Sequence, residues 1–209
     1  MKPNTPEWKS LSVEEKNQML QITEDKLKKM PTEVLIQAYI DNPFCSLMFA
    51  YNTSQDGFKR VCKEFNGLRE LLKRVDRAQK LIEFYKNMQA DGYDKSWDLK
   101  TIGEFTFKFT YIEILLSQPE IINQIRNSDV KIITNELVQK YNKKAELINK
   151  HSIIGLESCA YAVAHILNQR GKLLSQADDA IELFLKTGHV HQNGILDKIM
   201  QKAIQTINE

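Results

Sequence analysis

Large apolar residues recur at helical spacing along most of the chain. The clearest run is separated by intervals of three and four residues and comprises Phe58, Val61, Phe65, Leu68, Leu72 and Val75. This seam predicts one continuous helix, even though it passes through Asn66-Gly67, a dipeptide typical of tight turns. Gly67 falls on the side away from the seam. Either that side is solvated or another backbone packs closely there, and we expect the second.

The same spacing, together with capping residues, predicts about ten helices joined by short connections. Predicted helix starts are Ser10 or Ser12, Thr23, Asp76 in a capping box with Gln79, Ser96 or Asp98, Ser128 and Ser175. Pro119 is predicted in the first turn of a short helix. Gly171 and Gly188 are predicted to end helices, and the segment 152–171 is nearly apolar and should be the central helix.

Three segments carry further expectations about burial. In segment 31–43 the predicted buried side comprises Val34, Leu35 and Ala38, with Ile40 as a further candidate. Segment 44–52 is apolar almost all round, which predicts a short helix buried in the middle of a bundle. The lysine-rich stretches 24–30 and 140–150 interleave acids with lysines and are interpreted as solvated helix faces.

Segment 104–116 is ambiguous. Phe105, Phe107, Phe109 and Tyr111 alternate as in a strand, whereas Phe105, Phe109, Ile112 and Leu116 fit a helix. An isolated strand would have no partner in this chain, so we expect a helix. With only eight glycines and five prolines in 209 residues, the chain is predicted to be all-α. We expect a single domain, 1–209, built as an irregular multi-helix bundle or α-α superhelix.

The charge pattern narrows the class of partner. The chain has 29 basic and 27 acidic residues, a net charge of +2, so no electrostatic case exists for nucleic acid or an anionic membrane. No apolar stretch approaches the roughly 20 residues that span a bilayer, so no transmembrane segment is expected. The first ten residues contain no signal-peptide core, although a mature secreted domain would look the same.

Candidate chemistry is sparse. The three cysteines, Cys45, Cys62 and Cys159, are expected to be buried free thiols, with a Cys45–Cys62 bridge as the alternative. His189 and His191 form an H-x-H pair that can supply two metal ligands, but no third ligand is near in sequence, and a solvated loop is the alternative. We expect no cofactor, since the phosphate-binding, nucleophile-elbow and zinc motifs are missing.

Four acids and one histidine are further candidates for catalysis. Glu104, Glu113, Glu157 and Glu182 lie in apolar surroundings, but nothing in the sequence selects a pair for acid–base work. His165 lies on the apolar helix and is expected to be a core or inter-helix residue. Its separation from Cys159 places the two side chains about 120° apart. A pocket that pairs His165 with Glu157 or Glu113 would favour an enzyme.

The order of segments in the first half resembles a family of uncharacterised bacterial helical domains. The resemblance covers residues 5 to 125 and rests on "TPEW", "PTEVLIQAYIDNPF", "FAYNTSQDGF" and "EFNGLRELLKR". Members of that family tend to be exported or surface-associated. The resemblance therefore implies an extracytoplasmic, all-α accessory domain, and it implies no activity or catalytic residue.

Three functions follow as hypotheses. The first is a non-catalytic module of the bacterial cell envelope or exterior that binds a protein, peptide or cell-wall component. Its candidate contact residues are the aromatics Trp8, Tyr51, Tyr93 and Trp97, for which packing at helix ends is the alternative. The second is an enzyme or small-ligand-binding protein with a site assembled between helices. The third is a cytoplasmic helical adaptor, dimeric through an exposed apolar seam.

Overall fold

Helices form all the regular structure in the part of the chain that the computed structural model describes, residues 5–173 and 178–209. The predicted all-α class is confirmed. Thirteen α-helices and one 3-10 helix lie in these residues, more than the ten predicted, because several are only one or two turns long. No helix among the described residues is both long and apolar enough to cross a membrane.

The first half of the chain consists of short helices. They are α1 (Pro6–Ser10), α2 (Val13–Leu20), α3 (Glu24–Lys29), α4 (Thr32–Ile40), the 3-10 helix η1 (Pro43–Ala50), α5 (Ser54–Glu64), α6 (Asn66–Leu71) and α7 (Arg77–Asn87). In its described residues, the second half contains the three longest helices, α8 (Leu99–Leu116), α10 (Asn127–Glu146) and α11 (Ile148–Gln169), together with three shorter ones, α9 (Pro119–Ile122), α12 (Asp179–Thr187) and α13 (Ile195–Asn208).

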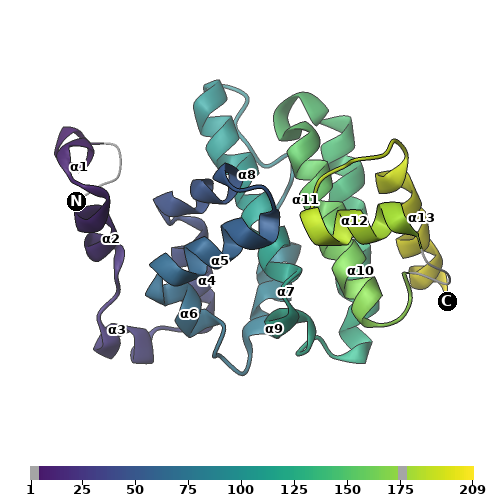
Figure 1. Cartoon of the computed structure of the whole chain (residues 1–209), viewed down its shortest axis with the longest axis horizontal. Coiled ribbons are helices and arrows are strands. Elements are labelled where there is room, and N and C mark those ends of the chain that lie inside the picture. The colour runs from purple at the N-terminus through teal and green to yellow at the C-terminus, as the bar shows by residue number, and fades with distance from the viewer. Residues whose placement is uncertain (1–4, 174–177) are drawn as a thin grey trace.

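The helices follow one another along the longest axis of the molecule (Figure 1). Helices α1 to α3 lie at one end and α13 lies at the other, whereas α12 turns back over α11 and contacts α5. Helix α8 stands between the two halves, where it contacts α4, α5 and α7 on one side and α11 on the other.

Helix α11 is the most enclosed element. It packs against α8, α10, α12 and α13, and every side chain from Ser158 to Ala164 is buried. The small side chains of the alanines at 160, 162 and 164 let neighbouring helices approach α11 on several sides. Close packing of this kind is the rule in protein interiors. The prediction of a central helix at 152–171 is therefore confirmed.

The ambiguous segment 104–116 is helical throughout. It forms the greater part of α8, which begins after Asp98, and the Asp98 carboxylate accepts a hydrogen bond from the Thr101 N–H at 2.7 Å. Phe109 is buried, while Phe105 and Phe107 are partly buried against the core. The alternation of aromatics does not mark a strand, because helix α8 has neighbours on more than one side.

The predicted continuous helix from Phe58 to Val75 is wrong. Phe65 has an extended backbone, with φ −120° and ψ 113°, and it separates α5 from α6. The Asn66 side chain compensates for the lost helical continuity: it donates to the Ile22 carbonyl at 2.7 Å and accepts from the Ile22 N–H at 3.0 Å. These bonds fasten the α2–α3 connection to the start of α6. The register changes at the break, so Leu71 is buried, Leu72 is only partly buried and Val75 is 90% exposed.

Gly67 lies beneath the ring of Phe65. A Cβ atom at position 67 would overlap that ring, and both residues are buried. The expectation that a second backbone packs against Gly67 is therefore wrong. A side chain from the preceding extended residue occupies the space that glycine leaves.

Two predicted buried faces are wrong in part. In α4, Val34 is 44% exposed, and the buried residues include Ile36 and Tyr39, because α4 turns that side toward α6, α7 and α8. In η1, only Cys45 and Met48 are buried. A 3-10 helix has three residues per turn, so these two share one side and the other apolar residues of η1 face outward.

Several predicted helix ends are confirmed. Ser12 forms a capping box with Glu15 at the start of α2. Gly171 and Gly188 have positive φ angles of 65° and 77°, the left-handed conformation that follows a helix end. Ser175 lies outside the described residues.

Thr23 and Asp76 directly precede α3 and α7 as predicted, but the other predicted capping bonds are wrong. Helix α10 already begins at Asn127, so Ser128 lies inside it and does not cap it. The Asp76 carboxylate accepts a hydrogen bond from the Thr32 hydroxyl at 2.7 Å instead of capping α7, and Thr23 makes no side-chain cap bond. In the Asp76 case a contact between distant segments replaces the predicted local one.

We predict that Gly67→Ala lowers the free energy of unfolding by about 1–3 kcal/mol, because the added methyl group overpacks the buried Phe65 ring. Gly103→Ala is the matched control. Gly103 is also helical, and nothing lies within 4 Å of a Cβ at that position. It should raise the free energy of unfolding by up to about 1 kcal/mol through helix propensity. Urea unfolding of both variants measures this, and a stabilising Gly67→Ala would contradict the packing described.

Candidate binding pocket and the buried polar network

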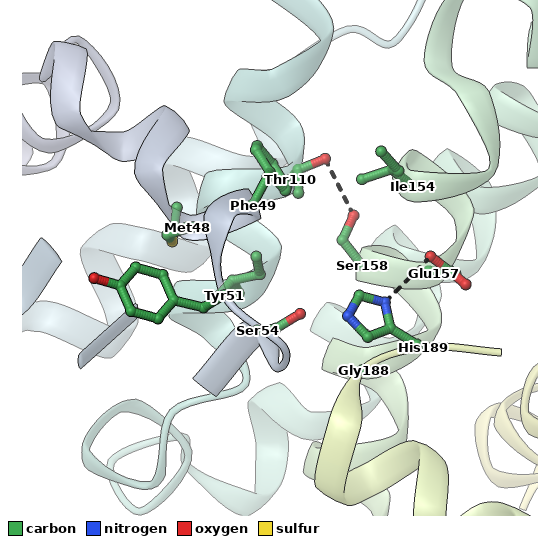
Figure 2. A pocket seen from close by; sticks show the side chains of 11 residues that line it. Met48, Phe49, Tyr51, Ser54, Thr110, Ile154, Glu157, Ser158, Gly188 and His189 are labelled. Atoms are coloured by element: carbon green, nitrogen blue, oxygen red, sulfur yellow. Dashed lines mark hydrogen bonds and ion pairs between the residues drawn. The ribbon is translucent and has the colours of Figure 1, made fainter. Parts of the chain in front are cut away.

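A pocket of about 160 Å³ lies between η1, α8, α11 and the segment that follows α12. We call it the η1–α11 pocket. Figure 2 shows its lining side chains, which come from both halves of the chain. They are Met48, Phe49, Tyr51, Ser54, Thr110, Ile114, Ile154, Glu157, Ser158, Gly188 and His189.

Close packing of η1 on α5 positions one wall of the pocket. Gly57 of α5 is buried beneath Met48, and a Cβ atom there would overlap the Met48 backbone. Glycine therefore lets the two elements approach at backbone distance. Phe49 on the same 3-10 helix packs against rings of α8, with centroids 4.9 Å from Phe107 and 6.1 Å from Tyr111. Phe49 and Tyr51 nevertheless remain 40% exposed.

Glu157 on α11 forms the charged part of the pocket wall. Its Oε1 atom accepts a hydrogen bond from the Val190 N–H at 2.9 Å, which holds the segment after α12 against α11. Its Oε2 atom lies 3.9 Å from His189 Nδ1, too far for a hydrogen bond. The Glu157 side chain is 14% exposed. One carboxylate oxygen thus serves the fold, and the other faces the pocket region shown in Figure 2.

Ser158 links the pocket to a buried polar network. Its hydroxyl lies 2.6 Å from Glu113 Oε2 and 3.3 Å from both Thr110 Oγ1 and the Gly155 carbonyl. A serine hydroxyl has one proton, and the shortest of these contacts is to a carboxylate, so the hydroxyl donates to Glu113.

Glu113 and Lys144 form a fully buried ion pair at the centre of that network. Both side chains are 0% exposed, and Lys144 Nζ lies 2.5 Å from Glu113 Oε1. Tyr85 donates to the same oxygen at 2.6 Å, and Lys144 also donates to the Gly155 carbonyl at 3.1 Å. Since an unpaired buried charge costs several kcal/mol, each partner is tolerated only while the other is in place. The network joins α7, α8, α10 and α11.

The surroundings of the cysteines indicate structural rather than catalytic roles. All three are free, so the alternative of a Cys45–Cys62 bridge is not realised. Burial raises the pKa of the Cys159 thiol, which donates to the Leu137 carbonyl at 3.1 Å. Burial likewise raises the pKa of Cys45, whose thiol donates to the Tyr39 carbonyl at 3.0 Å. Thiols held in the protonated form in this way are poor nucleophiles and poor metal ligands.

His151 lies beside the network at a break in α11. Ser152 has φ 56° and ψ 176°, a strained conformation for a residue other than glycine. His151 Nε2 lies 2.7 Å from the Ala90 carbonyl, whereas Nδ1 is buried with no hydrogen-bond partner among the described residues. Burial lowers the pKa of His151 and nearby Lys144 lowers it further, while the Ala90 carbonyl and Glu113 oppose the shift.

The structure does not bring the four candidate aromatics together. Trp8 is buried, with 7% of its surface exposed. Tyr51 lines the η1–α11 pocket. Tyr93 and Trp97 both pack edge-on against Phe105, at centroid distances of 6.1 and 5.9 Å. Of the four, Tyr51 is the one in contact with the pocket.

The histidines are also dispersed. His189 lines the η1–α11 pocket, but His191 Nε2 lies 3.2 Å from the Thr187 hydroxyl. No group of three or more metal-ligating side chains is found in the described part of the chain. His165 Nε2 lies 3.0 Å from the Leu185 carbonyl, where the residue is partly buried as expected. The histidine near Glu157 is therefore His189, and the pairing of His165 that would favour an enzyme is not formed.

Two of the four candidate acids belong to the site. Glu113 and Glu157 have the roles described above, whereas Glu182 is exposed and Glu104 lies 3.7 Å from Lys100 on the surface. The apolar neighbours of Glu113 in the sequence indicate that this acid is buried. No such indication exists for Lys144, because it lies in a lysine-rich stretch interpreted as solvated. That interpretation is wrong for Lys144, which is fully buried, and for Lys140, which is 7% exposed.

We predict that Lys144→Met lowers the free energy of unfolding by about 3–5 kcal/mol, because it leaves Glu113 charged and buried without a partner. Adding Glu113→Gln should recover much of the loss, since glutamine retains an acceptor for Ser158 and removes the charge. Lys143→Met is the control. Lys143 is 43% exposed, and its ion pairs should contribute within about 1 kcal/mol. Urea unfolding measures the free energy of unfolding of the two single variants and the double variant. Equal losses for Lys143→Met and Lys144→Met would refute the role of the buried pair.

Protonation of His151 should destabilise the fold. Its folded-state pKa lies below the ordinary value of 6.5, so the unfolded chain binds the proton first as pH falls. The free energy of unfolding should therefore decrease as pH drops below about 6.5 and level off below the folded-state pKa. His151→Gln keeps a donor for the Ala90 carbonyl and should reduce this dependence. The pKa of His165 is lowered by burial in the same direction, so His151→Gln/His165→Gln should flatten the curve further. Urea unfolding between pH 8 and 5 measures the slope, and an unchanged slope in the double variant would exclude both histidines as its source.

Comparisons with known proteins leave the site to be interpreted from its own chemistry. No protein-family model, no curated protein and no solved structure matches the chain.

Proposed function

We propose that the chain is a non-catalytic helical binding module that receives a small apolar group of its partner in the η1–α11 pocket. The observation that carries this proposal is the composition of the pocket. Apolar side chains from η1, α8 and α11 form its walls, and a few polar groups converge on it from α8 and α11. Ligand sites in proteins have this character, with apolar walls and a small number of placed polar groups.

Exposed apolar side chains of η1 and of Tyr51, the residue that follows it, support the same proposal. Leu47, Phe49 and Tyr51 are each between 37% and 40% exposed, and two of them line the pocket. Exposed apolar side chains that gather around a pocket favour a binding role over a merely solvated surface. The partner classes expected from the sequence, a protein, a peptide or a cell-wall component, all present groups of this size. The extracytoplasmic setting stays a prediction from the family resemblance.

An enzyme is the alternative function. Ser158 reaches the pocket and donates to Glu113, an arrangement that a nucleophile and its base would also show. The rest of the network favours a structural role for this contact. Glu113 also accepts hydrogen bonds from Lys144 and Tyr85, and it lies fully inside the protein. We therefore assign Ser158 and Glu113 to positioning α11 against α8 and keep the non-catalytic proposal.

Filling the pocket should abolish ligand binding. We predict that benzyl alcohol, used as a small apolar probe, shifts backbone amide resonances of Ile154, Ser158 and His189 in an NMR titration, with an affinity in the millimolar range expected for so few atoms. Ile154→Trp should remove these shifts, because position 154 lines the pocket. Ile153→Trp is the matched control, since the adjacent Ile153 is 52% exposed and does not line the pocket. If the probe shifts no pocket resonance, or if Ile154→Trp binds as well as the wild type, the proposed site is wrong.

A further inference from the structure

We infer that the η1–α11 pocket selects an organic ammonium ion, meaning a primary amine carried on a short apolar body. This inference rests on the proposed binding function and specifies the chemistry of the ligand. It follows from the charge of the lining residues, the hydrogen bonds of Glu157 and the size of the pocket.

The lining residues make the pocket acidic. Glu157 is the one carboxylate among them, and none of the lining residues that the structure describes is a lysine or an arginine. The nearest cation of the adjoining network is Lys144, which is fully buried and already paired with Glu113. His189 also lines the pocket, 3.9 Å from Glu157, and is a cation only when protonated. An anionic ligand would therefore meet the Glu157 carboxylate with no lysine or arginine to compensate it, whereas a cation would meet its complement.

The Glu157 carboxylate has one oxygen to offer. Oε1 is held by the Val190 N–H, but no hydrogen-bond donor to Oε2 is found among the described residues. His189 Nδ1, at 3.9 Å, is too distant to serve. An ammonium N–H placed in the pocket would donate to this oxygen, and a hydrogen bond between two charged groups is among the stronger ones in proteins.

The apolar walls require that the cation carry a hydrocarbon body. Met48, Phe49, Ile114 and Ile154 surround most of the pocket, and a bare ammonium ion would leave them uncovered. A volume of about 160 Å³ is close to that of an engineered apolar cavity that holds benzene, roughly 150 Å³. The ligand class is thus a single small apolar group with one positive charge. A free amine and a lysine side chain of a partner protein both satisfy it.

Three probes of similar size separate charge from shape. Benzylamine, benzyl alcohol and benzoate are titrated separately against the full chain near neutral pH and followed by NMR shifts of the pocket amides. We expect benzylamine to bind at least about tenfold more tightly than benzyl alcohol, which is the effect of one hydrogen bond to a charged group. Benzoate should bind more weakly than either. A doubly capped lysine and its norleucine counterpart distinguish the two sources, because preferential binding of the lysine shows that a peptide side chain is accepted.

Glu157→Gln isolates the carboxylate. Glutamine retains a carbonyl oxygen for the Val190 N–H, so the segment after α12 should stay in place and benzyl alcohol should bind as before. The preference for benzylamine should disappear. Glu182→Gln, an exposed acid on α12, is the matched control and should leave the preference unchanged.

The outcomes separate the two proposals. If benzylamine and benzyl alcohol bind equally, or if Glu157→Gln keeps the preference for the amine, the ammonium inference is overturned while the binding function stands. If none of the probes shifts a pocket resonance, both proposals fail.

Discussion

The fold depends on keeping one buried charge next to another. Glu113 on α8 and Lys144 on α10 are both inaccessible to solvent, and neither is tolerable alone. Their hydrogen bonds also engage Tyr85 on α7 and the Gly155 carbonyl on α11. Four helices must therefore dock together for either charge to be satisfied. This requirement fixes how α11 lies against α8, and Ser158 is held where those helices face the pocket.

The pocket has two walls, and a different contact positions each of them. Segment 43–50 forms a 3-10 helix, so Cys45 and Met48 point inward while Phe49 remains partly exposed. Gly57 lets this element lie directly on α5. On the opposite side, Glu157 holds the segment after α12 through the Val190 N–H. The η1 wall is thus positioned by Gly57, and the opposite wall by the Glu157–Val190 hydrogen bond. The two walls face each other because the Glu113–Lys144 pair aligns the long helices.

The two acids of the site, Glu113 and Glu157, differ in how many of their oxygens accept hydrogen bonds from the protein. Both oxygens of Glu113 accept hydrogen bonds from donors inside the protein, so this carboxylate serves the fold. Glu157 uses one oxygen for the fold and leaves the other without a donor among the described residues. The proposal of an ammonium ligand follows from this difference.

The sequence by itself determined the helical class and most helix positions, because these depend on interactions within a few residues. The spacing of apolar residues, the Ser12 cap and the Gly171 and Gly188 ends all act over one or two turns. Only the tertiary structure decided the break at Phe65, the burial of Lys144 and the pocket. Asn66 bonds to a residue 44 positions away, and Lys144 pairs with one 31 positions away. Local pattern carries no information about such partners. A lysine in a lysine-rich stretch therefore looks solvated until the fold places a glutamate beside it.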